Sequence, residues 1–448
     1  MEIVLPDSVK DILSKFDDAG YEIYIVGGAV RDILMNRPTN DWDFTTNAVP
    51  EEILKVIPEG FYDNQFGTVG LAVDEFEKPL EITTYRTEQG YSDSRHPDKI
   101  NWGKSLEEDV SRRDFTINAL ALDKNLKIVD LFKGEEDIEN KLVRAVGEAN
   151  ERFSEDALRM MRAVRIASEL GFKIEENTFE AIKKNAPLIQ KIAKERVKDE
   201  LFKLLGSNNP YEGMVLFRDS GLMNEILPEM EKCFGVEQKS PGRHHIYDVG
   251  THLLMSLKNC KSQDIVTRFA TLIHDIGKPQ TYRKLNTGVI TFYNHEMVST
   301  RIAENIADRL RFSKKEKDKF VTLVRWHQFT VDENQTDSAI RRILRNVGLD
   351  NMEDMLALRV ADRLGGGARE TSWRLEEFKT RLIEVQKQPF SIKDLKINGN
   401  DVMKELNIKP GPEIGKILEK LFEEVVEKKL ENNKETLIQN LKTLTPKS

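Results

Sequence analysis

Two aspartates that flank a tryptophan, Asp41 and Asp43 around Trp42, have the spacing of a divalent-cation site. The segment 41–45 has strand character, and the two-residue period of a strand places both carboxylates on one face. Mg²⁺ usually takes one or two protein carboxylates and completes its octahedron with water and substrate phosphate oxygens. The pair therefore predicts a catalytic Mg²⁺ site, although a solvated turn often shows the same spacing.

A glycine pair precedes these acids. Gly27 and Gly28 lie between an apolar segment, 21–26, and a helical segment that carries Arg31 and Asp32. At a strand-to-helix turn without side chains, backbone N–H groups can approach a phosphate, and an arginine can add a charge-assisted hydrogen bond. We therefore predict a phosphate-binding turn, with a turn selected for tight packing as the alternative.

A second charged group has residue types suited to a nucleotide. Arg112 and Arg113 are adjacent cations that suit phosphate, and Asp114 suits a ribose hydroxyl. Glu81, in the strand-like segment 80–85, is a candidate third metal carboxylate. Without the acids at 41 and 43, a surface ion pair and a structural glutamate would explain these residues as well.

A helix expected to begin near Ser154 carries acids and arginines, several of them on one stripe. These residues are Glu155, Asp156, Arg159, Arg162 and Arg165. N-capping by Ser154, with acids in the first turn and i,i+3 ion pairs, is the structural explanation of the same pattern.

Taken together, these segments resemble a known family. The stretch GGAVRDILMNRPTNDWDFTT (27–46) resembles the nucleotidyltransferase signature of class II tRNA nucleotidyltransferases, the CCA-adding enzymes, and of bacterial poly(A) polymerases. RRDFTIN (112–118) resembles the family's second motif, which implies that it contacts the sugar and phosphates of the incoming nucleotide and adds Asn118 to the site. EDALR (155–159) is similar to the motif that acts as an amino-acid template for the base, and ERVKDE (195–200) to one that braces the template helix.

The hydrogen-bond chemistry of Asp156 and Arg159 predicts which bases would be accepted. A carboxylate only accepts hydrogen bonds and a guanidinium only donates them. Cytosine and adenine each present an amino donor beside a ring-nitrogen acceptor, which matches this pair. Uracil and guanine reverse both partners and would leave buried polar groups unpaired. The expected substrates are therefore CTP and ATP, joined to the 3′-hydroxyl of tRNA with Mg²⁺ at Asp41 and Asp43.

The loop that follows Tyr85 bears on the choice among family activities. Segment 85–106, with Arg86, Asp93 and Arg95, resembles the full flexible loop of CCA-adding enzymes, and segment 63–68 lacks the basic patch usual in poly(A) polymerases. This favours complete CCA addition and repair. CC-only addition, A-only addition and poly(A) synthesis are the alternatives within the family.

A histidine-rich block forms a second candidate site. His252, the pair His274–Asp275, and Asp362 follow the order H…HD…D and resemble the HD phosphohydrolase superfamily. Imidazole with carboxylate suits Mn²⁺, Ni²⁺, Co²⁺ or Fe. His295 and His327 are candidates to extend the site to a second metal. Two other readings are an HD phosphohydrolase whose N-terminal part only recruits RNA, and a non-catalytic RNA-binding scaffold.

Composition and pattern define the elements that must position these groups. A chain of 448 residues is too long to form a single hydrophobic core. Its net charge of -8 neither requires nor excludes binding to nucleic acid. Cys233 and Cys260 form no CxxC pair. No apolar run reaches the roughly 18 residues of a membrane helix, so we expect no membrane partner and a cytoplasmic location.

The family resemblance implies an α/β nucleotidyltransferase head, with a mixed sheet and helices, followed by an all-α neck, body, HD domain and tail. The sequence pattern after Gly134 is essentially helical. The same resemblance implies that the body, the HD domain and the tail bind tRNA, and we expect recognition of the acceptor and TΨC arms by shape. The predicted boundaries are 1–137 for the head, 138–205 for the neck, 206–238 for the body, 239–370 for the HD domain and 371–448 for the tail.

Overall fold

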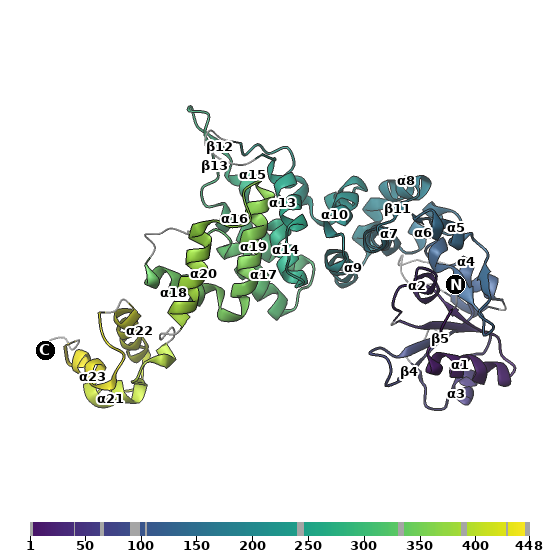
Figure 1. The fold of residues 1–448 in the computed structure, drawn as a ribbon, viewed down its shortest axis with the longest axis horizontal. Coiled ribbons are helices and arrows are strands. Elements are labelled where there is room, and N and C mark those ends of the chain that lie inside the picture. The colour runs from purple at the N-terminus through teal and green to yellow at the C-terminus, as the bar shows by residue number, and fades with distance from the viewer. Residues whose placement is uncertain are drawn as a thin grey trace. The chain divides into compact units, whose positions relative to one another are not determined.

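A computed structural model describes residues 3–39, 41–62, 67–89, 99–103, 105–239, 246–329, 336–386, 392–426 and 429–443. The chain forms two compact units (Figure 1). The first comprises Met1–Glu231 with Arg309–Arg311, and the second comprises Lys232–Asp308 with Phe312–Ser448. A mixed sheet with helices opens the chain and helices dominate the rest, which confirms the predicted fold class.

The main sheet of the first unit has the strand order β3-β4-β5-β2-β1-β8-β9 among the described residues. Strands β2 and β5 are parallel, and the other neighbours are antiparallel. The bounds are β1 (Ile23–Val26), β2 (Asp43–Thr46), β3 (Phe61–Tyr62), β4 (Thr68–Leu71), β5 (Leu80–Thr84), β8 (Leu120–Leu122) and β9 (Ile128–Asp130). A separate ribbon joins β6 (Arg86–Gln89) to β7 (Lys99–Trp102).

Helices bury the apolar side of this sheet. In the first helix Val9, Ile12, Leu13 and Phe16 are buried, which is the i, i+3, i+4, i+7 spacing of one helical face. They join Ile25, Phe44 and other strand residues in one core cluster. The helical bounds are α1 (Asp7–Asp18), α2 (Gly28–Leu34), α3 (Pro50–Val56), α4 (Leu106–Ser111), η1 (Thr116–Asn118) and α5 (Gly134–Glu139).

The remainder of the first unit is helical apart from one strand pair. Strands β10 (Leu142–Val143) and β11 (Lys173–Ile174) are parallel. Gly171, at φ 67°, adopts the left-handed conformation that ends α7 and turns the chain into β11. The helices are α6 (Ala149–Glu155), α7 (Leu158–Leu170), α8 (Glu176–Asn185), η2 (Ala186–Lys191), α9 (Lys194–Gly206), α10 (Pro210–Asp219), α11 (Leu222–Ile226) and α12 (Pro228–Glu231).

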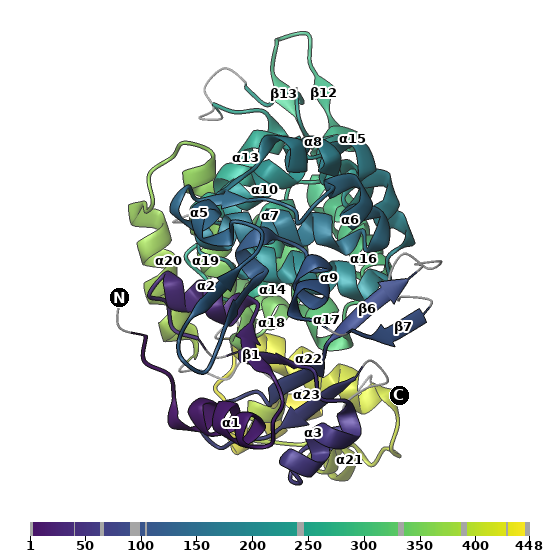
Figure 2. The same ribbon diagram turned by 90° about the vertical axis from the view of Figure 1, so that its right-hand side faces the viewer.

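The second unit is also mainly helical. Its helices are α13 (Val249–Lys258), α14 (Ile265–Ile273), α15 (Lys278–Thr281), α16 (His295–Arg309), α17 (Lys314–Trp326), α18 (Asp337–Val347), η3 (Leu349–Asn351), α19 (Met352–Gly365), α20 (Trp373–Gln386), η4 (Ile392–Asp394), α21 (Gly399–Leu406), α22 (Pro412–Val426) and α23 (Lys434–Thr443). The hairpin of β12 (Arg283–Lys284) and β13 (Ile290–Thr291) projects from these helices (Figure 2).

The expectation of an all-helical chain after Gly134 is therefore wrong in detail, because β10, β11, β12 and β13 follow it. These strands have two residues each, which is too short for period-2 alternation to appear in the sequence. Both cysteines are buried free thiols. Among the described residues, no helix combines the length and apolar composition needed to cross a bilayer.

Candidate functional site

The first candidate site lies where β2 meets β5. The register places Asp43, the first residue of β2, opposite Glu81 on the parallel strand. Asp41 precedes the strand, with a side chain that is 68% exposed and accepts a 3.0 Å hydrogen bond from Nζ of Lys78. Trp42 is buried between the two acids. The strand thus begins two residues later than predicted, so Asp41 lies before the strand rather than on one face of it with Asp43.

The electrostatics of Asp43 favour a bound cation. Burial, with Glu81 and Asp41 nearby, raises the pKa of Asp43 to about 6, and Arg113 and Lys78 offset this only in part. A divalent cation would remove the cost of placing the acids together, and carboxylate oxygens are the ligands that Mg²⁺ prefers. Asp41, Asp43 and Glu81 therefore fit a Mg²⁺ site at this edge of the sheet.

The glycine turn approaches the same carboxylate. Gly27 has φ 78°, a conformation that side-chain-bearing residues rarely adopt. A Cβ atom at Gly27 would lie 3.0 Å from Nη1 of Arg113 and 3.3 Å from Oδ2 of Asp43. Nε of Arg113 is buried and has no hydrogen-bond acceptor in the described parts of the chain. The turn, the acid and a donor suited to phosphate thus share one small space.

Replacement of Gly27 by alanine is expected to reduce nucleotide binding through this crowding. Gly20→Ala is a matched control, because Gly20 has φ 81° and no atom within 4 Å of its Cβ position. Gly27→Ala should lower the unfolding temperature more than Gly20→Ala, because Gly27 combines φ 78° and ψ -143°, close to a region occupied essentially by glycine, with a crowded Cβ position. Only Gly27→Ala should raise the KM for nucleotide, by about tenfold or more. Equal KM values for the two variants would contradict the proposed role of the turn.

Arg31, Asn118, Asp114 and Arg162 form one hydrogen-bonded chain. Arg31 donates from Nη1 to Oδ1 of Asn118 at 2.7 Å and from Nε to Asp32 at 3.0 Å. Asn118 donates to Oδ1 of Asp114 at 3.1 Å, and Arg162 donates to Oδ2 of Asp114 at 2.8 Å. Burial opposes ionisation of Asp114, but Arg162 and Asn118 outweigh it and lower its pKa to about 2. This series of hydrogen bonds connects α2, η1 and α7. A contact between Asp114 and a ribose hydroxyl stays a prediction.

The arginine pair of the second motif has an anchor that sequence reasoning missed. Asp109 is fully buried and accepts from Nη2 of Arg112 at 2.6 Å and from Nη2 of Arg113 at 3.5 Å. Burial raises the pKa of Asp109, but the two guanidinium groups outweigh this and hold it below its usual value. The available signal was its position three and four residues before the arginines, at the spacing of helical neighbours.

The predicted template segment is not one continuous helix. Helix α6 ends at Glu155, Asp156 is extended, and α7 begins at Leu158. Oδ1 of Asp156 accepts from the backbone N–H of Leu158 at 3.0 Å, a side-chain bond that competes with continued helix. Ser154 caps nothing; its hydroxyl donates to the Asn150 carbonyl within α6 at 2.8 Å. The expected helix start and single stripe are therefore wrong, because Asp156 occupies the break.

Arg159 lies on α7 directly beyond this break. It donates to Glu155 at 2.5 Å and to the backbone carbonyl of Arg112 at 2.9 Å. The second contact attaches the template segment to the end of α4, next to the second motif. A guanidinium has five N–H donors, so these contacts are compatible with donation to a base.

Helix α9 braces this segment, as expected. Arg196 donates to Oδ2 of Asp156 at 2.9 Å, and Arg165 donates to Oε2 of Glu200 at 2.7 Å. Each ion pair joins α9 to a residue of the template segment that lies 40 or 35 positions earlier in the chain. The structure thus places Arg165 in the contact with α9. Asp93 and Arg95, expected in the flexible loop, lie outside the described residues.

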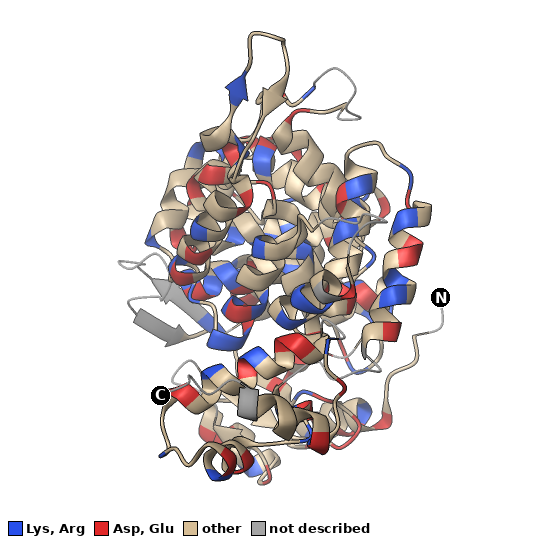
Figure 3. Ribbon diagram, turned by 90° about the vertical axis from the view of Figure 1, so that its left-hand side faces the viewer, with Lys and Arg blue, Asp and Glu red and all other residues tan. Residues whose placement is uncertain are grey.

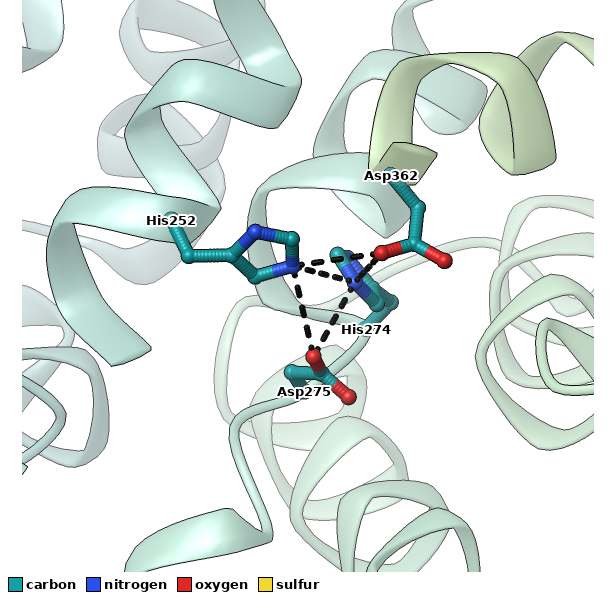
Figure 4. A group of neighbouring side chains, drawn as sticks. All are labelled: His252, His274, Asp275 and Asp362. Atoms are coloured by element: carbon teal, nitrogen blue, oxygen red, sulfur yellow. Dashed lines mark hydrogen bonds and ion pairs between the residues drawn. The ribbon is translucent and has the colours of Figure 1, made fainter. Parts of the chain in front are cut away.

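The second candidate site gathers the four predicted HD residues (Figure 4). Nε2 of His252 lies 3.2 Å from Oδ1 of Asp362 and 3.4 Å from Oδ2 of Asp275. Nε2 of His274 lies 3.5 and 3.4 Å from the same two oxygens. One atom from each residue converges within 4.8 Å of the others, an arrangement able to hold a metal ion.

Close helix packing produces this convergence. A Cβ atom at Gly365 of α19 would lie 2.2 Å from Oγ of Ser256 on α13, so only glycine permits the approach that sets Asp362 opposite His252. Nδ1 of His274 lies 2.8 Å from the Thr271 carbonyl. Because a carbonyl only accepts, Nδ1 carries the proton and Nε2 faces the cluster, the orientation typical of metal-binding histidines.

The same aspartate joins a second group. Oδ1 of Asp275 lies 3.0 Å from Nε2 of His295 and 3.4 Å from Nε2 of His327. Nζ of Lys278, which sequence reasoning did not single out, lies 2.5 Å from Oδ2 of Asp275. Burial lowers the pKa of His274, but Asp275 and Asp362 outweigh it and raise the pKa to about 10. The cluster thus favours a cation at its centre.

With this geometry in place, sequence comparisons identify the family. Three family models match successive parts of the chain: "Poly A polymerase head domain" over residues 23–144, "Probable RNA and SrmB- binding site of polymerase A" over residues 171–234, and "tRNA nucleotidyltransferase domain 2" over residues 289–441. The CCA-adding enzyme of Ligilactobacillus salivarius is 37% identical over 444 residues, 98% of each chain. The chain belongs to the family of CCA-adding enzymes.

Other CCA-adding enzymes are similar to this chain over nearly its full length. The enzyme of Limosilactobacillus reuteri is 34% identical, with 98% of this chain and 97% of the relative covered. The crystal structure of the Bacillus stearothermophilus CCA-adding enzyme in complex with CTP has a TM-score of 0.72 and 29% identity, covering 97% of this chain and 96% of that one. The Thermotoga maritima CCA-adding enzyme complexed with tRNA shares the fold, with a TM-score of 0.61 and 19% identity over 99% and 97% of the chains.

Proposed function

We propose that this chain completes and repairs the 3′-terminal CCA sequence of tRNA, with CTP and ATP as substrates and pyrophosphate as the product. The observation that carries the proposal is the meeting of Asp43, the Gly27 turn and Arg113 at one edge of the head sheet. Full-length similarity to CCA-adding enzymes, one of them solved with CTP, supports these substrates.

In this proposal Asp41 and Asp43, with Glu81 beside them, hold Mg²⁺. A bound Mg²⁺ supplies charge neutralisation at the phosphates and lowers the pKa of the attacking hydroxyl. The protein's own groups orient the triphosphate: Arg113 offers its buried N–H, and the backbone at Gly27 and Gly28 allows close approach. The tRNA 3′-oxygen then bonds to the α-phosphorus as the bond to pyrophosphate breaks.

Base selection is assigned to Asp156 and Arg159. The break between α6 and α7 holds the carboxylate beside Arg196, and Arg159 is held at the carbonyl of Arg112. These contacts hold an acceptor and a donor at the start of α7, and together the two groups would match the hydrogen-bond pattern of cytosine and adenine. We assign Glu155, Arg162 and Arg165 to positioning, because Glu155 holds Arg159, while Arg162 and Arg165 connect α7 to Asp114 and Glu200.

The tRNA is expected to contact the helical parts through its acceptor and TΨC arms. Lysines and arginines are interspersed with acidic residues over the helices (Figure 3). We therefore propose that the helical parts recognise the shape of the tRNA backbone through many weak contacts, and not through a single basic face. The neck, body, HD and tail boundaries given above belong to the same proposal.

The test is an extension assay with Mg²⁺ and tRNA transcripts that lack CCA, end in C or end in CC. Each transcript is offered CTP, ATP, both, UTP or GTP, and products are resolved at single-nucleotide length. All three should reach the same CCA end without incorporation of UMP or GMP. A stop at CC, extension of the CC transcript alone, or an unlimited A tail would instead show CC-adding, A-adding or poly(A) activity.

A second candidate function is metal-dependent phosphohydrolysis in the second unit. The observation that favours it is the convergence of His252, His274, Asp275 and Asp362. This ligand set fits Mn²⁺, Ni²⁺, Co²⁺ or Fe. His295 and His327 would hold a second ion, with Asp275 shared between the two positions.

The substitution His274→Ala is expected to lower Mn²⁺ affinity at this cluster by at least about tenfold to a hundredfold, since loss of a ligand should cost at least as much as loss of a second-shell partner. Any phosphatase activity should disappear with it, while CCA addition should remain. Metal content is measured after dialysis, with Glu304→Ala on the exposed face of α16 as the control. Loss of CCA addition together with the metal would show that the two activities are not separable.

A further inference from the structure

A cavity of about 340 Å³ lies in the head, beside the segment that leads from α2 into β2. Ile33 of α2 lines one part of it, and Ile3 and Pro6, which precede α1, line another. Trp42, which stands between the two acids of the proposed Mg²⁺ site, belongs to the same wall. This volume lies within the roughly 300–1,000 Å³ typical of small-molecule sites. A small ligand in the cavity would therefore contact the residue that separates the two acids.

Trp42 carries a buried donor without an acceptor. Only 3% of its surface is exposed, and its ring lies near that of Phe76, with centroids 6.2 Å apart. Nε1 nevertheless has no hydrogen-bond partner in the described parts of the chain. An indole N–H only donates, and a buried tryptophan usually finds a partner for it. Because an unpaired buried donor costs free energy, a ligand that supplies an acceptor here would stabilise this wall.

Arg37 is the cation of the same wall. Asn36 adopts φ 53° at the end of α2, where its N–H donates to the Ile33 carbonyl at 3.0 Å and that of Arg37 donates to the Asp32 carbonyl at 2.8 Å. This turn ends the helix and places Arg37 in the wall, where its guanidinium has no partner among the described residues. Thr39 adds a buried hydroxyl that also lacks a partner there. None of the described residues that line the cavity is acidic.

We propose that this cavity binds a small monocarboxylate with a branched apolar body, such as a short branched-chain fatty acid. The carboxylate accepts from Nε1 of Trp42 and from the guanidinium of Arg37, and the apolar body lies against the aliphatic part of the wall. A carboxylate only accepts hydrogen bonds, which matches a wall that has unpaired donors and no acid. The aliphatic residues favour a carbon body over a bare inorganic anion. The inference does not rest on the proposed nucleotide chemistry of the head.

The experiment follows the indole N–H signal of Trp42 by NMR in the full chain, which has four tryptophans. The substitution Trp42→Phe assigns this signal by its loss, or the other three Trp→Phe variants assign it by elimination. The probe is 3-methylbutanoate, which should shift the signal until it saturates. The neutral 3-methylbutanamide should bind at least about tenfold more weakly, because it lacks the charge. Acetate, which lacks three apolar carbons, should bind about 10- to 50-fold more weakly.

Arg37→Gln should weaken binding of 3-methylbutanoate by about 10- to 100-fold, because a charge-assisted hydrogen bond is lost. Lys55→Gln is the matched control, since it removes the same charge from an exposed position of α3 outside the wall, and it should leave binding unchanged. Thermal unfolding shows that both variants fold. The inference is overturned if the Trp42 signal shows no saturable shift, if the amide or inorganic phosphate binds as tightly as the carboxylate, or if the two variants weaken binding equally.

Discussion

Replacement of Asp43 by alanine is expected to abolish nucleotide addition, with kcat at least about a thousandfold lower, which corresponds to about 4 kcal/mol of transition-state stabilisation. Asp43 is the acid that lies nearest the Gly27 turn and in register with Glu81. Without it, the site loses the partly buried carboxylate whose pKa is raised and which a cation would stabilise. Extension of a CC-ending tRNA transcript, followed at single-nucleotide length, measures the effect, and tRNA binding should remain.

The isosteric variant Asp43→Asn separates catalysis from folding. Because burial raises the pKa of Asp43 to about 6, ionisation above that pH costs the folded state free energy, and the cost grows as pH rises from the unfolded pKa through 6. At pH 7, without metal, Asp43→Asn should therefore unfold at the same or a higher temperature while losing activity. Asp74→Ala, at an exposed acid of the head, should change neither property. Nucleotide addition within tenfold of the parent in Asp43→Asn would overturn the assignment.

Several strands of the head and two of its site residues could be predicted from local sequence pattern. The strand-like segments 21–26, 41–45 and 80–85 predicted β1, β2 and β5, because short buried strands bounded by glycine or polar turns are local features. Asp43 and Gly27 were found from spacing alone. Their meeting with Arg113 was not predictable from spacing, since it depends on sheet order: β1 pairs with both β2 and β8, and the second motif follows α4 just before β8.

Two failures have physical causes of the same kind. The break at Asp156 was missed because helical periodicity continues on both sides of it, and the partner that stabilises the extended residue, Arg196, is 40 residues away. Arg363 was not singled out because nothing in the sequence shows that this helical arginine lines a cavity beside Asp362. The H…HD…D order did single out the four residues that converge in the cluster.

Base selection should weaken when Asp156 becomes asparagine. The amide can donate where the carboxylate only accepts, so uracil's carbonyl finds a partner that the parent chain does not offer. A bidentate contact carries about 1–3 kcal/mol of discrimination between bases, so the ratio of kcat/KM for CTP over UTP should fall about 10- to 100-fold. The ratio is measured on a transcript that lacks CCA, with each nucleotide offered alone. Asp199→Asn, at an exposed acid of α9, is the matched control.

Arg196 provides the test that distinguishes selection from positioning. Arg196 contacts Asp156 at 2.9 Å and is assigned to hold it. In Arg196→Ala the carboxylate keeps its acceptor chemistry but loses its fixed place, so kcat/KM for CTP and ATP should fall while UTP and GTP are still rejected. In Asp156→Asn the rejection itself should weaken. If both variants lower kcat/KM equally for all nucleotides and leave the CTP-to-UTP ratio unchanged, Asp156 supports the fold of the template segment and the choice of base is made elsewhere.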